Sequence, residues 1–244
     1  MNRVIVITGA SRGLGLALSR KFLEAGDRVF GLSKSRRYWK SAKENISAPD
    51  RLTLDQVDLT SEAEVKHYVR KLKKQASQID ILINNAGVSG KLLRVEEIPQ
   101  REIQTVMAAN LFSAFYITKH LIPIFRAQKR GAMIINIASM AAIRAVPRLF
   151  AYSAGKFGIL ALSQCIAKEN QDANLKSITV CPGGMNTGMR ASLFGAEDAN
   201  RQQTPEFVAD VIMQVIDEKI HVDSGGDITI RHGKVTEIRA CPQA

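Results

Sequence analysis

The chain has 244 residues, of which 45% are hydrophobic and 23% are charged, a composition typical of a globular protein with one substantial core. No apolar run reaches the ~18 residues that a membrane-spanning helix needs, and the N-terminal apolar stretch is too short for a signal peptide. The net charge of +11 favours anionic ligands. No aromatic-rich RNA motif or recognition-helix pattern accompanies it, so we expect neither membrane insertion nor specific nucleic-acid binding.

The cysteines and histidines follow no ligand or disulfide pattern. The 3 cysteines are odd in number and lie in unrelated contexts, which predicts reduced thiols and argues against a disulfide framework. The 4 histidines, at positions 67, 120, 221 and 232, have no metal-ligand spacing. We therefore expect a cytoplasmic protein without a metal site.

The N-terminal residues predict a strand, a glycine loop and a helix in succession. Residues 4–7 are apolar, and a helical pattern follows the loop at residues 8–15. Gly9 permits a tight turn, Gly13 lets the backbone approach a pyrophosphate, and Gly15 allows close helix packing. The helix N-terminus offers amides and a positive dipole end to phosphates. We therefore predict a dinucleotide loop made of Gly9, Ser11, Arg12, Gly13, Leu14 and Gly15.

The second predicted strand, residues 28–32, ends where an acidic side chain would hold the adenosine ribose of NAD. No acid is present at that point. Ser33 and Lys34 stand there instead, and Arg12 lies in the first loop, a setting that suits a 2′-phosphate. We therefore predict NADP(H) as the cofactor. A solvated basic loop remains the alternative for Arg36, Arg37 and Lys40.

The third and fourth predicted strands, residues 51–58 and 80–83, end in further candidate cofactor residues. Asp58, followed by Leu59, could accept a hydrogen bond from an adenine amino group, or it could be a turn residue only. Small and amide residues after the fourth strand suit a backbone that approaches the cofactor. These are Asn85, Ala86 and Gly87.

A long helical pattern starts at Pro99 and contains Asn110. A buried asparagine inside a helix is unfavourable unless its amide has partners. Asn110 is therefore either exposed or functional. Pro123 is predicted to kink or end this helix.

The stretch from Ser139 to Lys156 carries the candidate chemistry. Ser139 follows an apolar run that predicts a buried strand, at the position where open α/β sheets bind ligands. Tyr152 and Lys156 are four residues apart, so on a helix they share one face. A nearby ammonium favours the phenolate, which lets a tyrosine exchange a proton near neutral pH. We interpret Tyr152 as acid/base, Lys156 as its tuner and Ser139 as a hydrogen-bond partner; two ordinary surface residues are the alternative for the Tyr-Lys pair.

The remaining elements continue the alternation of strands and helices. Residues 176–181 predict a sixth strand, residues 188–204 a substrate loop or short helical lid, and residues 227–230 a short last strand. Thr204-Pro205-Glu206 is typical of a helix start. We expect one α/β domain over residues 1–244, a Rossmann-type doubly wound parallel sheet of about seven strands with helices on both faces.

Together these motifs resemble the short-chain dehydrogenase/reductase family, from residue 4 to about residue 220. The glycine loop resembles the family's cofactor loop, and Asn84-Asn85-Ala86-Gly87 resembles its sheet-stabilising and cofactor motif. The catalytic tetrad of the family is matched in order and spacing by Asn110, Ser139, Tyr152 and Lys156. The segment after the sixth predicted strand resembles the family's nicotinamide-side motif, with Pro182, Gly183, Met185 and Thr187.

The resemblance implies hydride transfer between NADP(H) and a small carbonyl or alcohol substrate, with reduction as the cellular direction. Tyr152 would protonate the substrate oxygen, and Ser139 would hydrogen-bond that oxygen. Lys156 would lower the Tyr152 pKa and bind the nicotinamide ribose. Asn110 would hold a water that links Lys156 to solvent.

Two segments depart from the family pattern. Residues 225–244 are polar and charged, where many family members carry a strand and an apolar tail that help to build a tetramer. A homodimer, a homotetramer and a monomer are therefore all open. The segment after Thr187 is short, and the candidate substrate residues mix apolar and basic groups. They are Leu93, Arg144, Met189 and Phe194.

Two other classes of function stay open on the sequence. A catalytically silent NADP-binding regulator or scaffold would use the same fold, although an intact tetrad argues against it. A binder of nucleic acid or of a membrane surface is suggested only by the charge of +11. Salt-sensitive binding at physiological ionic strength would support that second alternative.

Overall fold

A computed structural model describes residues 3–44, 46 and 48–242, and one sheet runs through them. Its spatial order is β3-β2-β1-β4-β5-β6-β7-β8, and all neighbours are parallel except the antiparallel pair β7 and β8. The predicted doubly wound parallel sheet is confirmed. The strands are β1 Val4–Thr8, β2 Arg28–Ser33, β3 Leu52–Gln56, β4 Ile81–Asn84, β5 Ala132–Ile137, β6 Leu175–Pro182, β7 Asp227–Arg231 and β8 Lys234–Arg239.

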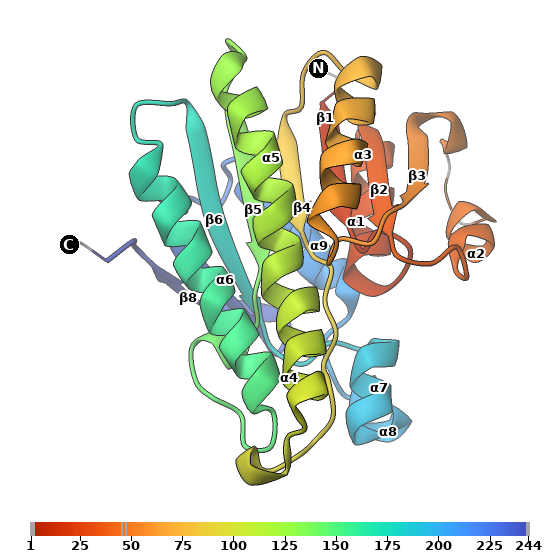
Figure 1. Ribbon diagram of the computed structural model, residues 1–244, viewed down its shortest axis with the longest axis vertical. Coiled ribbons are helices and arrows are strands. Elements are labelled where there is room, and N and C mark those ends of the chain that lie inside the picture. The colour runs from red at the N-terminus through yellow and green to blue at the C-terminus, as the bar shows by residue number, and fades with distance from the viewer. Residues whose placement is uncertain (1–2, 45, 47, 243–244) are drawn as a thin grey trace.

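Helices cover both faces of the sheet (Figure 1). α1 (Gly13–Glu24) and α9 (Pro205–Ile216) pack on one face, and α3 (Glu62–Gln75), α5 (Ser113–Ala127) and α6 (Phe150–Glu169) pack on the other. None of the helices described is long and apolar enough to cross a bilayer. The shorter segments are α2 Trp39–Glu44, α4 Gln100–Met107, α7 Gly188–Phe194, α8 Ala196–Asn200, the 3-10 turns Pro49–Arg51, Val95–Glu97 and Met140–Ala142, and the π-helical turn Ala108–Phe112.

The central strand β1 is buried on both sides, because residues 4–7 form an apolar run without polar interruption. Along β1, Ile5 and Ile7 pack against α1 and α9, whereas Val6 between them packs against α3 and α5. Successive strand residues point to opposite faces. A run of β-branched residues therefore supplies both layers of the core at once and fixes β1 at the centre of the molecule.

Local signals in the sequence set the ends of several helices. The side chain of Thr204 accepts a hydrogen bond from the Phe207 amide, and Pro205 is the first helical residue of α9. Gly26, with φ of +90°, follows the end of α1 as a glycine cap. The predicted start of α9 is confirmed.

Two expectations about the second half of the chain need correction. Pro123, predicted to kink or end its helix, does not end it, since α5 continues to Ala127. Leu121 and Phe125 on either side of it are buried in the core, and this packing offsets the one missing backbone hydrogen bond. The sheet also has an eighth strand, β8, in the segment expected to be a polar tail. A two-residue turn at His232 and Gly233, both with positive φ, connects it to β7.

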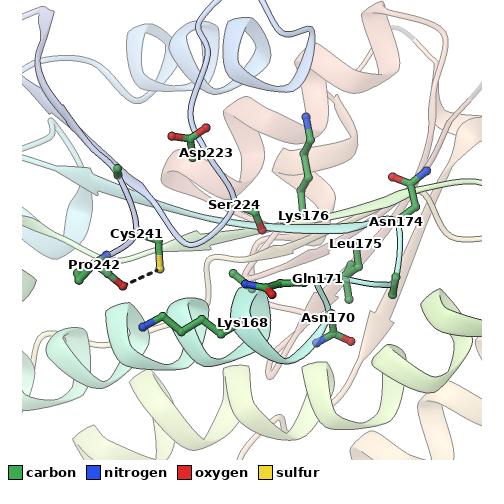
Figure 2. A pocket seen from close by; sticks show the side chains of 13 residues that line it. Lys168, Asn170, Gln171, Asn174, Leu175, Lys176, Asp223, Ser224, Cys241 and Pro242 are labelled. Carbon is green, nitrogen blue, oxygen red and sulfur yellow. Dashed lines mark hydrogen bonds between the residues drawn. The ribbon is translucent and has the colours of Figure 1, made fainter. Parts of the chain in front are cut away.

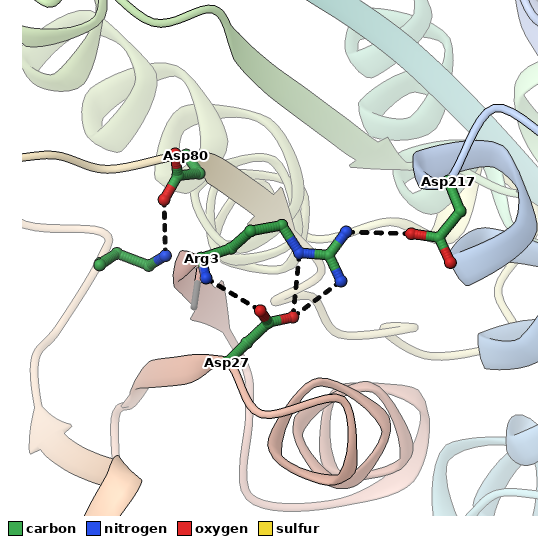
Figure 3. A network of polar contacts seen from close by, with 5 residues as sticks. Arg3, Asp27, Asp80 and Asp217 are labelled. Carbon is green, nitrogen blue, oxygen red and sulfur yellow. Dashed lines mark hydrogen bonds and ion pairs between the residues drawn. The ribbon is translucent and has the colours of Figure 1, made fainter. Parts of the chain in front are cut away.

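A buried ion pair ties the N-terminal strand to two distant segments (Figure 3). Arg3 donates to Asp27 Oδ2 from Nε at 3.0 Å and from Nη2 at 2.8 Å, while its Nη1 reaches Asp217 at 3.0 Å. Asp27 is only 1% exposed and follows α1, and Asp217 follows α9. Arg3 thus joins β1 to the ends of both helices on one face of the sheet.

We expect the substitution Arg3→Met to lower the free energy of unfolding by about 2 kcal/mol, because Asp27 would keep a buried charge with only a backbone amide as partner. The loss should stay below the ~3–5 kcal/mol of a fully buried pair, since the Arg3 side chain is 23% exposed. Urea denaturation measures the change. Arg70→Met, at an exposed position of α3, is the control and should shift stability by less than ~0.5 kcal/mol. Equal stability of the two variants would contradict the role of Arg3.

Candidate active site

The order of the strands creates a crevice beside β1. From β1 the chain moves to β2 and β3 on one side, and then to β4 and β5 on the other. Loops at such a switch point diverge and leave room for a ligand at the carboxyl ends of the strands. A cavity of about 360 Å³ lies there. Its lining includes the predicted cofactor residues Gly9, Ser11, Arg12, Gly13, Leu14, Ser33, Lys34, Asp58, Leu59, Asn85, Ala86, Gly87, Tyr152, Lys156, Met185 and Thr187.

The glycine loop adopts the conformation that its sequence predicts. Gly9 and Gly13 have φ of +68° and +52°, a region that other residues rarely adopt. Gly15 does not line the cavity but packs α1 against the loop, because a Cβ there would lie 2.2 Å from the Gly9 carbonyl oxygen. No side chain caps the N-terminus of α1. Its first backbone amides therefore remain available to phosphate oxygens.

Asn85 holds this loop against the end of β4. Its Nδ2 donates to the Thr8 carbonyl at 2.9 Å and to the Gly9 carbonyl at 3.3 Å. In return, Thr8 Oγ1 accepts from the backbone amides of Asn85 at 2.8 Å and Ala86 at 2.9 Å. The two sides of the crevice are therefore linked by four hydrogen bonds.

The basic segment after β2 is arranged around two aromatic rings. The guanidinium groups of Arg12 and Arg37 lie 5.3 and 5.4 Å from the centre of the Tyr38 ring. Ser33 Oγ accepts from Trp39 Nε1 at 2.7 Å and donates to the Ser35 carbonyl at 3.0 Å. The Ser33 hydroxyl is therefore engaged within its own loop. Arg12, which also lines the cavity, is held in place by stacking.

Asp58 serves as a turn residue and as an ion-pair partner. Its Oδ1 accepts from the Thr60 amide and hydroxyl, and its Oδ2 lies 2.7 Å from Lys34 Nζ. The pKa of Asp58 is lowered, because these hydrogen bonds outweigh burial, which is the largest single influence and acts to raise it. The turn interpretation of Asp58 is what the contacts support, and Lys34 is already paired.

A second cavity of about 470 Å³ adjoins the first, and Tyr152, Met185, Thr187 and Met189 line both. Ser139 and Gly183 line the second cavity. Of the predicted substrate residues, Arg144, Met189 and Phe194 line this space. Leu93 does not: its amide donates to the Arg148 carbonyl at 2.9 Å, and it lies beside a much smaller void.

Ser139 and Tyr152 come together from a strand end and a helix. Ser139 follows β5, and its Oγ accepts from the Ala141 amide at 3.1 Å. Tyr152 lies in the first turn of α6. Burial raises the pKa of Tyr152 above its ordinary value, and a hydrogen bond with Ser139 opposes this shift.

Lys156 is buried one turn further along α6. Its Nζ donates to the Ile137 carbonyl at 2.8 Å and lies 5.8 Å from the centre of the Tyr152 ring. Burial lowers the pKa of Lys156 to about 8, because an ammonium is poorly solvated in the interior. In this structure burial is the largest influence on the pKa of Tyr152, and the Lys156 ammonium donates to the backbone of β5. That Lys156 lowers the Tyr152 pKa stays a prediction.

Asn110 is buried, at 1% exposure, in the π-helical turn between α4 and α5. Its Nδ2 donates to the carbonyls of Val88 at 2.8 Å and Val106 at 2.9 Å, and its Oδ1 accepts from the Val88 amide at 3.2 Å. A Cβ on Gly87 would lie 2.4 Å from Asn110 Oδ1 and 3.6 Å from Lys156 Nζ. The glycine thus leaves open the space that both polar groups border. π-helical turns of this kind are frequent at functional sites.

A third cavity, of about 620 Å³, lies at the opposite end of α6 (Figure 2). Figure 2 shows Lys168, Asn170, Ser224 and Cys241 around it, between the end of α6, the start of β6 and the C-terminal segment. Lys168 is 16 residues from Tyr152 along α6, which at a rise of ~1.5 Å per residue separates them by about 24 Å. None of the predicted catalytic or cofactor residues lines this cavity.

Several lining residues were not predicted from the sequence. Ser35, Tyr38, Thr60 and Ser113 belong to the first cavity, and Arg231 and His232 to the second. Tyr38 and Trp39 follow the basic run directly, and this aromatic-basic alternation is the signal that could have revealed the stacking. Pro182, predicted to face the nicotinamide, lines neither cavity. No group of three or more His, Cys, Asp or Glu side chains within the described chain could hold a metal ion.

Comparison with known proteins agrees with this geometry. The short chain dehydrogenase family matches residues 3–198. The chain is 27% identical over 241 residues to a 3beta-hydroxysteroid dehydrogenase 2 of Eggerthella lenta, covering 93% of each chain. It is 28% identical over 228 residues to an NADPH-dependent pterin aldehyde reductase of Arabidopsis thaliana, again covering 93% of each. The crystal structure of a levodione reductase, 24% identical, superposes with a TM-score of 0.87 over 95% of this chain and 96% of that one. The protein therefore belongs to the short-chain dehydrogenase family of oxidoreductases.

Proposed function

We propose that the protein is an NADP(H)-dependent oxidoreductase that transfers a hydride between the nicotinamide and a carbonyl or alcohol substrate, with Tyr152 as acid/base. The observation that carries the proposal is the position of Tyr152, which lines both the cofactor-sized crevice and the adjoining cavity. A group between these spaces can exchange a proton with a substrate while the hydride crosses from one to the other.

The chain's own residues fit a dinucleotide in the first cavity. The backbone of Gly9 and Gly13, with positive φ, and the uncapped N-terminus of α1 suit a pyrophosphate. Arg12 offers a positive charge on the same wall. Lys156 and Tyr152 at the far end would hold the nicotinamide ribose, and Thr187 and Met185 would lie beside the ring.

Each group around Tyr152 has a role in carbonyl reduction. When bound, NADPH supplies the hydride that reduces the carbonyl carbon, so the chain must supply one proton to the oxygen. Tyr152 donates that proton, and its raised pKa keeps the phenol protonated until the oxygen gains negative charge. Ser139 hydrogen-bonds the same oxygen. The products are the alcohol, oxidised cofactor and a Tyr152 phenolate, which regains a proton from solvent.

Two further residues would support this proton transfer: Lys156, one turn along α6 from Tyr152, and Asn110. The Lys156 ammonium stabilises the phenolate that forms, since an opposite charge nearby favours the charged form. Asn110 Oδ1 keeps a second lone pair beside the open space at Gly87, where a water could pass a proton between Lys156 and solvent. The other hydrogen bonds of Asn110 fix its orientation.

A preference for NADP(H) over NAD(H) is supported by the charges after β2. Asp58 is the acidic residue that lines this end of the crevice, and it is paired with Lys34. Arg12, stacked on Tyr38, has no acidic partner in the part of the chain that the structure describes. A 2′-phosphate would find a guanidinium there, and a ribose diol would find no free carboxylate. The relative from Arabidopsis is named as NADPH-dependent.

The segment 188–204 would act as the substrate-side cover. It forms α7 and α8, and Met189 and Phe194 from α7 line the second cavity. Relatives of similar coverage are named for a steroid and for a pterin aldehyde. The identity of the substrate must therefore follow from this chain's own lining residues.

Replacing Tyr152 tests the proposal most directly. We expect Tyr152→Phe to lower turnover by about 1,000-fold, because the acid is lost, while the NADPH dissociation constant changes by less than about twofold since the ring is kept. Stopped-flow turnover with a carbonyl panel and cofactor fluorescence give the two values. Tyr116→Phe, on α5 outside both cavities, is the matched control. Turnover within tenfold of the unsubstituted protein would refute the acid/base role.

The charge on Arg12 tests the cofactor preference. We expect Arg12→Gln to weaken NADPH binding about tenfold, the loss of one charge-assisted contact, and to leave NADH binding nearly unchanged. Fluorescence titration with both cofactors measures the ratio, with Arg70→Gln on exposed α3 as control. Parallel weakening of NADPH and NADH binding would show that Arg12 supports the loop and does not read the 2′-phosphate.

The low pKa of Lys156 predicts a pH limb. An ammonium is charged only below its pKa, so the kcat/KM for NADPH, which reports the free enzyme, should fall as the pH rises through about 8. The measurement is the initial rate of carbonyl reduction at subsaturating NADPH between pH 6 and 10. In Lys156→Met any residual activity should lack this limb. Persistence of the same limb in that variant would assign it to another group.

A further inference from the structure

Among the described residues, the second cavity is lined by several basic side chains and by no acidic one. Its basic side chains are Arg144, Arg190, Arg201, Arg231 and His232, and no aspartate or glutamate lines it. The remaining wall includes apolar groups such as Val146, Leu149 and Leu193. A cavity of about 470 Å³ with this composition is suited to an apolar body that carries negative charge.

Two of the arginines are already neutralised by neighbours. Arg190 donates to Asp198 Oδ2 at 3.0 Å and stacks on Phe194 at 4.1 Å from the ring centre. Arg201 forms an ion pair with Glu197, one helical turn away. These two arginines therefore hold α7 and α8 in place and do not need a ligand to balance their charge.

Arg144 and Arg231 differ, because neither guanidinium has an ion pair or hydrogen bond to any residue that the structure describes. Arg144 lies five residues after Ser139, and its backbone amide is held by the Met140 carbonyl at 3.1 Å. Arg231 ends β7. The two free cations therefore reach one cavity from different parts of the fold.

The backbone around Arg231 is fixed on the cavity wall. Gln203 Nε2 donates to the Ile230 carbonyl at 3.0 Å, and Gln203 Oε1 accepts from the Gly233 amide at 3.3 Å. The same Ile230 carbonyl accepts from the Gly183 amide at 2.7 Å. A Cβ on Gly183 would lie 3.0 Å from Arg231 Cγ, so the arginine stem packs closely over that glycine. The turn of the β7–β8 hairpin thus presents Arg231 as a fixed part of the site.

We propose that the carbonyl substrate carries an anionic group, which Arg144 and Arg231 bind while the carbonyl lies at Tyr152 and Ser139. This inference rests on the proposed reductase function and names the substrate class of the same site. A planar guanidinium pairs well with a carboxylate, sulfonate or phosphate through charge-assisted hydrogen bonds. The anion could belong to a small molecule or to a phosphorylated carrier such as coenzyme A, and the shared chemistry is negative charge attached to the carbonyl compound.

Matched substrates test the proposal. NADPH oxidation is followed with 4-carboxybenzaldehyde and with its methyl ester, methyl 4-formylbenzoate, which has the same aldehyde without the charge. Acetoacetyl-coenzyme A and the acetoacetyl thioester of N-acetylcysteamine form a second pair, which tells a carrier phosphate from a carboxylate. Each is measured with the unsubstituted protein, with Arg144→Gln and Arg231→Gln, and with Arg70→Gln as control. Arg231→Lys, which keeps the charge, tests for rescue.

We expect Arg144→Gln and Arg231→Gln each to lower kcat/KM for the charged member of at least one pair by tenfold or more, mainly through KM. The uncharged member should change by less than twofold, and Arg231→Lys should recover part of the loss. Equal changes for charged and uncharged members in both pairs, or no change in either, would overturn the proposal while leaving the reductase function intact.

A binding measurement distinguishes the anion site from the proposed oxidoreductase function. Calorimetry with 4-(hydroxymethyl)benzoate and its methyl ester, on protein saturated with NADP⁺, should give at least tenfold tighter binding of the acid, and Arg231→Gln should remove the difference. If this held but no carbonyl compound were reduced, the anion site would stand and the proposed oxidoreductase function would fail. Equal binding of acid and ester, together with equal kcat/KM changes in the coenzyme A pair, would refute the anion site.

Discussion

The hydrogen bonds between Thr8 and Asn85 are the contacts on which the rest of the site depends. The two residues are 77 positions apart, yet they join the ends of β1 and β4, where the sheet changes its direction of winding. Because Asn85 also donates to Gly9, the glycine loop cannot move away from β4. Gly15 then brings α1 against the same loop, at a distance that no side chain would allow. Ser139 enters from the end of β5, which pairs with β4, and Tyr152 and Lys156 enter from α6.

Burial is the main influence on the pKa values of Tyr152 and Lys156. It raises the pKa of Tyr152 and lowers that of Lys156 to about 8, so both groups are pushed toward their neutral forms. A protonated phenol is the form that carbonyl reduction requires, and burial favours it before the reaction. In the proposed reaction the Lys156 ammonium would act later, when its charge would stabilise the Tyr152 phenolate. The hydrogen bond from Lys156 Nζ to the Ile137 carbonyl fixes the position of the amine beside Tyr152.

The sequence could predict those parts of the site that depend on strand ends and on residue spacing. The apolar runs, the glycine loop and the order of the polar residues place Ser139, Tyr152 and Lys156 at one edge of a parallel sheet, and the structure brings them there. Spacing could not show that the Lys156 amine turns toward the backbone of β5, because that depends on tertiary packing. Nor could the hydrophobic periodicity reveal β8, because its residues are mostly exposed and half of them are charged. The turn residues His232 and Gly233 carried the only local signal for the hairpin.

β8 pairs with β7, the strand that ends in Arg231 at the second cavity. Arg239 pairs with Asp227, which is 5% exposed, and this pair fastens the exposed strand to β7. A charged edge strand also discourages pairing with another sheet. The hairpin pairs Arg231 with Lys234 beside the turn, and the Arg231 stem packs over Gly183 on the cavity wall. The polar C-terminal segment that departs from the family pattern therefore carries Arg231, which has no ion pair with any described residue, to the wall of the second cavity.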